Sequence, residues 1–117
     1  MSFEHVLAVV PVSDIATATE WYGRLFGREP DNNPMETLVE WRVTTNGWVQ
    51  VTQDPEHAGR AYLNLAVSNL DKHIVELSAR GLKSGAVQPV NKGVLLSPIS
   101  DPDGNSINLV GNFRVKY

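Results

Sequence analysis

Val-Ser-Asp-Ile at residues 12–15 opens a stretch with helical periodicity that ends at Gly27, and Val-Ser-Asn-Leu at residues 67–70 opens a second stretch that ends at Gly81. The two phrases begin at residues 12 and 67, which are 55 positions apart in a chain of 117 residues. A repeat of this period is typical of a supersecondary unit that is used twice. The sequence therefore predicts two similar halves, each a strand, a helix and further strands, with a cleft for a ligand between them.

Short polar residues and glycines mark the ends of the predicted helices. Ser13 or Asp14 can cap the first helix by accepting a backbone N–H bond, and Ser68 or Asn69 can do the same for the second. Gly27 can end the first helix, because glycine adopts the left-handed conformation without steric cost. Strands are expected at residues 4–11, 37–45, 48–53, 61–67, 93–100 and 106–112.

Asn46-Gly47 lies between two strand-like segments and is typical of a two-residue type I′ hairpin turn. In this register Trp41, Val43 and Thr45 share one face of the hairpin with Trp48, Gln50 and Thr52. Glu40 and Arg42 then lie on the opposite face, where we expect an ordinary surface arrangement of charges. These assignments depend on the turn, since a shift of one residue would exchange the two faces.

Alternation in strands 61–67 and 106–112 separates an aliphatic face from a polar one. The aliphatic side chains point to one side, where they can pack against the helices. The opposite side carries amide and hydroxyl groups from Tyr62, Asn64 and Asn108. Together with the hairpin tryptophans these groups predict a concave pocket lined by aromatic rings and amides, although such a sheet face can also be simply solvated.

Composition is that of one globular domain, with 42% hydrophobic and 20% charged residues. The net charge of −3 and the lack of a Lys/Arg cluster argue against nucleic acid and anionic membranes as partners. The absence of Cys excludes disulfides, thiolate metal sites and Cys nucleophiles. No signal peptide is recognisable and the longest apolar run is too short to span a bilayer, so we expect a cytoplasmic protein.

Several short motifs occur in a defined order along the chain. They are Val-Ser-Asp-Ile at 12–15, Trp-Tyr at 21–22, Leu-Phe-Gly at 25–27, Asp-Pro-Asp-Gly-Asn at 101–105 and Ile-Asn-Leu at 107–109. This pattern resembles the vicinal oxygen chelate superfamily, which includes glyoxalase I, extradiol dioxygenases, fosfomycin-resistance enzymes and bleomycin-resistance proteins. In character the chain is most similar to the metal-free, bleomycin-resistance-like branch.

The resemblance implies an architecture for the whole chain. It implies an α+β fold in which two βαβββ modules form a curved mixed sheet around a cleft, with the helices on the outer face. The modules would span about residues 1–57 and 58–117 of a single domain. Members of the superfamily are commonly homodimers in which the partner chain can complete the cleft, so we expect a homodimer.

In the metalloenzymes of that superfamily, four strand residues, usually His, Glu or Gln, hold a divalent cation. The resemblance carries these positions to Leu7, Gln50, Tyr62 and Asn108. Leucine offers no donor atom, neutral amide oxygens bind weakly, and tyrosine must first lose its proton. We therefore expect no metal and no other cofactor at this site.

The three histidines do not form a local metal motif. His5 shares a strand face with Leu7 and is expected to be a partly exposed residue at the start of the strand. His57 lies in a polar connector and is expected to be solvated. His73 flanks the buried stripe of the second helix and is expected to lie on the surface.

These observations favour a metal-independent protein that binds a small organic molecule in an aromatic- and amide-lined cleft. The residues predicted to contact that molecule are Leu7, Trp41, Trp48, Gln50, Tyr62, Asn64 and Asn108. No catalytic residue is assigned. The alternative is a divalent-metal-dependent lyase, isomerase or dioxygenase of the same superfamily, with an unconventional ligand set such as His5, Gln50 and Asn108. A third possibility is an accessory subunit whose cleft is vestigial.

Overall fold

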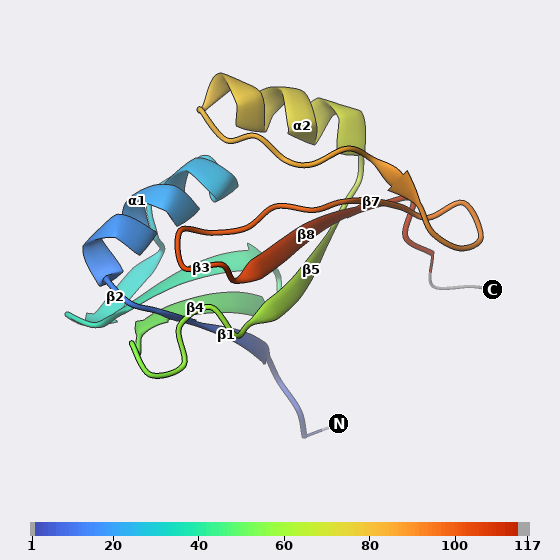
Figure 1. The fold of residues 1–117 in the computed structure, drawn as a ribbon. Helices are drawn as coiled ribbons and strands as arrows, with labels where there is room; N and C mark the ends of the chain where they lie inside the picture. The colour runs from blue at the N-terminus through green and yellow to red at the C-terminus, as the bar shows by residue number, and fades with distance from the viewer. Residues whose placement is uncertain (1, 115–117) are drawn as a thin grey trace.

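The computed structural model describes residues 2–114 and contains two helices and eight strands (Figure 1). In chain order they are β1 (Val6–Val12), α1 (Ile15–Phe26), β2 (Asn32–Met35), β3 (Leu38–Thr44), β4 (Gly47–Gln53), β5 (Tyr62–Val67), α2 (Leu70–Ala79), β6 (Gln88–Pro89), β7 (Leu95–Ser97) and β8 (Ser106–Gly111). Each half of the chain thus supplies a strand, a helix and three strands. No helix in the described part of the chain is long and apolar enough to cross a membrane.

The two halves build sheets of the same topology. The strand orders are β1-β4-β3-β2 and β5-β8-β7-β6. β1 runs parallel to β4 and β5 runs parallel to β8, while the other neighbouring strands are antiparallel. The predicted α+β fold with two βαβββ modules is confirmed. The strands form two four-stranded sheets, however, and not one continuous curved sheet within the chain.

Both helices begin at a capped residue. The Asp14 carboxylate accepts the Thr17 backbone N–H at 2.9 Å, and the Asn69 amide oxygen accepts the Lys72 N–H at 3.1 Å. Asp14 and Asn69, and not the serines before them, are therefore the caps. Gly27 follows α1 in the left-handed conformation, with a φ of 73°, as predicted.

A single apolar core joins the helices to one face of each sheet. α1 packs against β3 and β4, and α2 packs against β8. In β4 the buried residues Val49 and Val51 alternate with more exposed ones and point into the core. In β8 the residues from Ile107 to Gly111 are all buried, and Ile107 and Leu109 belong to the core. The opposite face of each sheet points away from the helices and is called its open face; on the second sheet Asn108 and Val110 of this face are nonetheless buried.

The hairpin between β3 and β4 differs from the prediction by one residue. Thr44 pairs with Gly47, so the turn residues are Thr45 and Asn46, and the register shifts between positions 42 and 44. None of Thr45, Asn46 and Gly47 has a positive φ, which excludes a type I′ turn. A Cβ atom at Gly47 would lie 2.5 Å from the Thr44 Oγ1 atom, so a larger residue there would force the Thr44 side chain to move.

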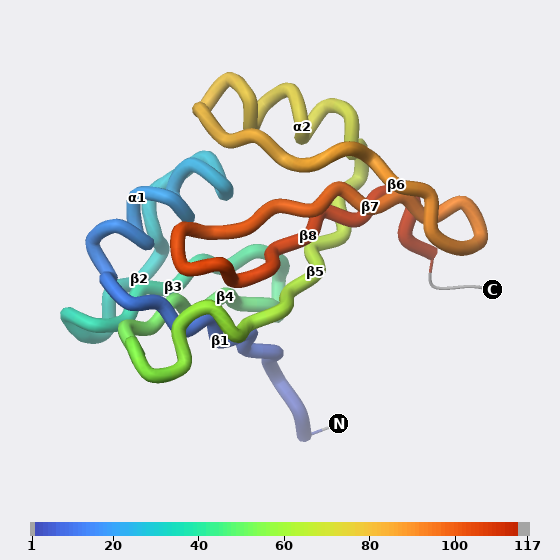
Figure 2. The backbone as a smooth tube through the Cα atoms, in the orientation of Figure 1, coloured from blue at the N-terminus to red at the C-terminus, as the bar shows by residue number. Residues whose placement is uncertain are grey.

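A buried polar network joins the two modules. The turn at 101–105 passes beside α1, as the tube in Figure 2 shows, and the Tyr22 hydroxyl donates a 2.7 Å hydrogen bond to the Asp101 carboxylate. The Asn105 amide donates to Asp101 at 2.7 Å and to the Pro11 carbonyl at 2.8 Å. Because Tyr22 and Pro11 belong to the first module, these bonds fix how the modules meet.

Candidate functional site

The open face of the first sheet combines exposed aliphatic side chains with aromatic and polar ones. Leu7 and Val9 of β1 are 53% and 55% exposed. Trp48 and Gln50 of β4 lie beside them in the parallel register, where Leu7 is paired with Trp48 and Val9 with Gln50. Three residues predicted to contact a ligand, Leu7, Trp48 and Gln50, therefore share this face.

Trp48 is held in place by two neighbours. Its indole N–H donates to the Nδ1 atom of His5 at 3.3 Å, and the guanidinium of Arg42 lies 5.9 Å from the centre of its ring. Arg42 is itself anchored, because two of its guanidinium nitrogens donate to the Thr45 carbonyl at 2.9 and 2.6 Å. A cation at this distance attracts the ring face electrostatically. The indole is thus oriented before any ligand arrives.

Glu40 and Arg42 lie on this open face, and the prediction that placed them on the opposite face is wrong. Glu40 is paired with Gln50, and Arg42 is paired with Trp48. The Gln50 amide donates to the Glu40 carboxylate at 2.5 Å, and the Asn32 amide donates to its other oxygen at 3.3 Å. The cause is the irregularity in β3 between positions 42 and 44, because it changes the register by one residue and so exchanges the faces, whereas the new position of the turn alone would not.

The same shift overturns the prediction for Trp41. Its side chain is fully buried on the core face, where its ring centre lies 5.4 Å from that of Phe26 and 6.2 Å from that of Tyr22. Its indole N–H donates to the Arg28 carbonyl at 3.1 Å, which satisfies its one polar group. Trp41 is a core residue and cannot touch a ligand on the open face.

The open face of the second sheet carries the remaining predicted residues. Asn64 is paired with Asn108, and Tyr62 is paired with Ser106, so the alternation in these strands was interpreted correctly. Tyr62 is 70% exposed, whereas Asn108 is buried and donates a 3.2 Å hydrogen bond to the Asn64 side chain. This face is uncharged and offers a phenol ring with two coupled amides.

The four positions that would hold a metal in the superfamily do not fit one. Leu7 and Gln50 belong to the first sheet, whereas Tyr62 and Asn108 belong to the second. Leucine has no donor atom, and the amides of Gln50 and Asn108 are neutral. Among residues 2–114, no three His, Asp or Glu side chains lie close enough together to hold a metal ion.

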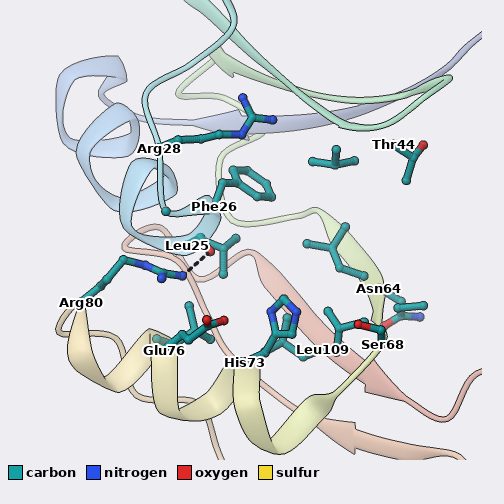
Figure 3. A pocket seen from close by; sticks show the side chains of 16 residues that line it. Leu25, Phe26, Arg28, Thr44, Asn64, Ser68, His73, Glu76, Arg80 and Leu109 are labelled. Atoms are coloured by element: carbon teal, nitrogen blue, oxygen red, sulfur yellow. Dashed lines mark hydrogen bonds between the residues drawn. The ribbon is translucent and has the colours of Figure 1, made fainter.

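A cavity of about 650 Å³ opens at the junction between the modules (Figure 3). It lies between the C-terminal end of α1, the end of β3, the strand β5 and helix α2, and we call it the junction cavity. Of the predicted ligand residues only Asn64 lines it. His73, predicted to lie on the surface, and Glu76 point into it from α2. The sequence carries no signal for this cavity, because its walls come from both halves of the chain.

Comparison of the sequence with models of protein families and with curated protein sequences finds no match. Comparison with solved structures finds a glyoxalase/bleomycin resistance protein from Catenulispora acidiphila, with a TM-score of 0.87 and 32% identity over 93% of this chain and 98% of the other. An antibiotic-binding protein from Streptomyces sp. is 25% identical, with a TM-score of 0.73 over 95% and 98% of the two chains.

A bleomycin-binding protein, solved in complex with bleomycin, shares the fold at 15% identity, with a TM-score of 0.75 over 96% of this chain and 100% of the other. The doubled βαβββ topology agrees with the fold of all three proteins. The first match covers nearly the full length of both chains at an identity that establishes common descent. The chain therefore belongs to the glyoxalase/bleomycin resistance protein family, within the vicinal oxygen chelate superfamily.

Proposed function

We propose that the protein binds a small organic molecule, without a metal ion, against the open faces of its two sheets. This proposal rests on the chemistry of those faces, which combine an oriented indole, hydrogen-bonded amides and exposed aliphatic side chains. A lining of this kind suits a planar organic molecule, which needs apolar surface and a few directed hydrogen bonds. The proposed contact residues are Leu7, Trp48, Gln50, Tyr62, Asn64 and Asn108.

The amide pairs would orient the bound molecule. Gln50 donates to Glu40 and Asn108 donates to Asn64, so the oxygens of Gln50 and Asn108 are left to accept hydrogen bonds from a ligand. The exposed ring of Tyr62 and the indole of Trp48 would supply stacking, at about 0.5–1.5 kcal/mol for each aromatic contact. The similar proteins described as bleomycin-binding and antibiotic-binding support small-molecule binding as the activity.

We further propose that the protein acts as a homodimer in which a second copy covers the open faces. β1 is an edge strand, and its Leu7 and Val9 side chains on the open face are 53% and 55% exposed. β5 is the edge strand of the second sheet and exposes Tyr62. Exposed edges with apolar side chains favour association with another chain. The cleft that the sequence predicts within one chain would then be completed between two.

Thermal unfolding with candidate ligands tests the binding site. Bleomycin is a reasonable first compound, followed by a library of planar organic molecules. A true ligand should raise the melting temperature of the wild-type protein and quench its tryptophan fluorescence. Trp48→Ala and Asn108→Ala should abolish both effects, and EDTA should change neither. A ligand whose binding survives both substitutions would show that the site lies elsewhere.

Metal analysis separates this proposal from the alternative of a metal-dependent lyase, isomerase or dioxygenase. The purified protein should carry no stoichiometric Ni, Zn, Fe or Mn. Bound metal that is lost in His5→Ala would overturn the metal-free proposal and favour the enzyme. Light scattering should give the mass of a dimer, and Leu7→Glu should convert it to a monomer.

A vestigial cleft and a cytoplasmic location are also open to test. An accessory subunit with a vestigial cleft would give no ligand in any thermal-unfolding screen. The cytoplasmic location stays a prediction from the sequence, and localisation of a tagged chain would test it.

A further inference from the structure

We propose that the junction cavity is a second binding site, which adjoins the open faces at Asn64, and that it takes a small protonated aromatic amine. Its volume of about 650 Å³ lies within the usual range for small-molecule sites, roughly 300–1,000 Å³. It is lined by apolar side chains from five elements, which include Leu25, Val43, Leu65, Leu77 and Leu109. An aromatic ring can therefore be removed from water on several sides at once.

Phe26 gives the cavity a fixed aromatic wall. Its ring is held from behind by Trp41, at 5.4 Å between ring centres, and by Tyr22, at 6.2 Å. In Figure 3 the Phe26 ring and the His73 imidazole extend into the cavity from opposite sides, one from α1 and the other from α2. A flat ring placed between them would contact one aromatic face on each side, which is a favourable arrangement for stacking.

The two arginines of the lining are already engaged. The Arg80 guanidinium donates to the Arg24 and Leu25 carbonyls at the C-terminal end of α1, at 2.5 and 3.2 Å. The Arg28 guanidinium forms an ion pair with Asp31 at 2.7 Å. The Asp31 carboxylate neutralises the charge of Arg28, whereas the carbonyls at the end of α1 offset the charge of Arg80 only in part.

Glu76 is the acidic group that remains for a ligand. Within residues 2–114, its carboxylate has no hydrogen bond or ion pair, and the His73 imidazole likewise has none. The two residues lie one helical turn apart on α2 and point into the cavity together. An ammonium group beside the Glu76 carboxylate would form a charge-assisted hydrogen bond while its ring stacks on Phe26. The Glu76 carboxylate and the Phe26 ring together favour a ligand that has a positively charged group and an aromatic ring.

Titration of the isotopically labelled protein with phenethylamine tests this site by NMR. Saturable shifts are expected for Ser68, His73 and Glu76, without matching shifts for Trp48. Hydrocinnamate has a similar ring and chain but carries a carboxylate, so it should bind at least about tenfold more weakly. Equal binding of the two probes would overturn the assigned charge, and shifts confined to the open faces would overturn the site.

Glu76→Gln keeps the shape of the side chain and removes its charge, so it should weaken phenethylamine binding about tenfold. Glu56→Gln is the matched control, because Glu56 is exposed in the connector between β4 and β5 and does not line the cavity. It removes the same charge and should leave the affinity unchanged. An equal loss in both variants would show a nonspecific charge effect, and the absence of saturable binding to the wild-type protein would refute the proposal.

Discussion

Replacement of Tyr22 by phenylalanine tests the role of the junction network in holding the modules together. The substitution keeps the ring, which is fully buried and packs against Trp21 at 4.8 Å and Phe26 at 6.2 Å between ring centres. It removes only the hydroxyl that donates to Asp101 at 2.7 Å. The change in stability therefore reports one hydrogen bond between the modules, separated from the packing of the ring.

The expected magnitude follows from the surroundings of Asp101. Its side chain is 4% exposed, so water cannot readily replace the lost donor. The carboxylate keeps three bonds, from the Asn105 amide at 2.7 Å and from the backbone N–H groups of Asn105 and Asp103 at 2.9 and 3.0 Å. A hydrogen bond to a charged group contributes about 1.5–3 kcal/mol. We expect a loss of about 2 kcal/mol, since the carboxylate stays largely satisfied.

Urea unfolding followed by tryptophan fluorescence measures this loss, and thermal unfolding should show a decrease of roughly 8 °C in the melting temperature. Tyr62→Phe is the control, because Tyr62 is 70% exposed and its hydroxyl has no hydrogen-bond partner among the described residues. It should change the stability by less than about 0.5 kcal/mol. Equal effects of the two substitutions, or a Tyr22→Phe effect below about 0.5 kcal/mol, would refute a structural role for the network.

Three further changes probe the fold. Trp41→Ala should cost about 3–5 kcal/mol in urea unfolding because the side chain is fully buried, whereas Trp48→Ala should cost much less. Burial, and then the bond to Asp101, raises the pKa of Tyr22 above its ordinary value of 10.0, so the folded chain keeps a proton that the unfolded chain releases. Above pH 10 the wild-type stability should therefore fall more steeply than that of Tyr22→Phe, by about 1.4 kcal/mol per pH unit. Asp14→Ala removes the α1 cap and should cost about 1 kcal/mol, measured in the same assay.

Local patterns in the sequence predicted the helices and the faces of the second sheet. Asp14, Asn69 and Gly27 act within one turn of the chain, so their roles could be seen without knowledge of the fold. The alternation of Tyr62 and Asn64 with aliphatic neighbours needed no assumption about a turn, and the structure places both on the open face.

The face assignments in the first sheet were less secure, because all of them depended on the register of one hairpin. Asn46-Gly47 is a strong hairpin signal, but it does not determine which two residues occupy the turn. An irregularity in β3 between positions 42 and 44 shifts the pairing by one residue. That single step moved Trp41 into the core and brought Glu40 and Arg42 onto the open face. The error therefore concerns the site more than the fold.

The motifs that indicated the family describe its scaffold and not its ligand. Tyr22 and Asp101 belong to those motifs, and in the structure both are buried where α1 meets the 101–105 turn. A turn signal explains Asp101 locally, but its bond to Tyr22 joins positions 79 residues apart and could not be seen in the sequence. Residues that fix the module junction are compatible with any ligand that the open faces accept. Under the proposed function, Trp48, Asn108 and their neighbours would select the ligand, and small side-chain changes there would alter binding without disturbing the junction.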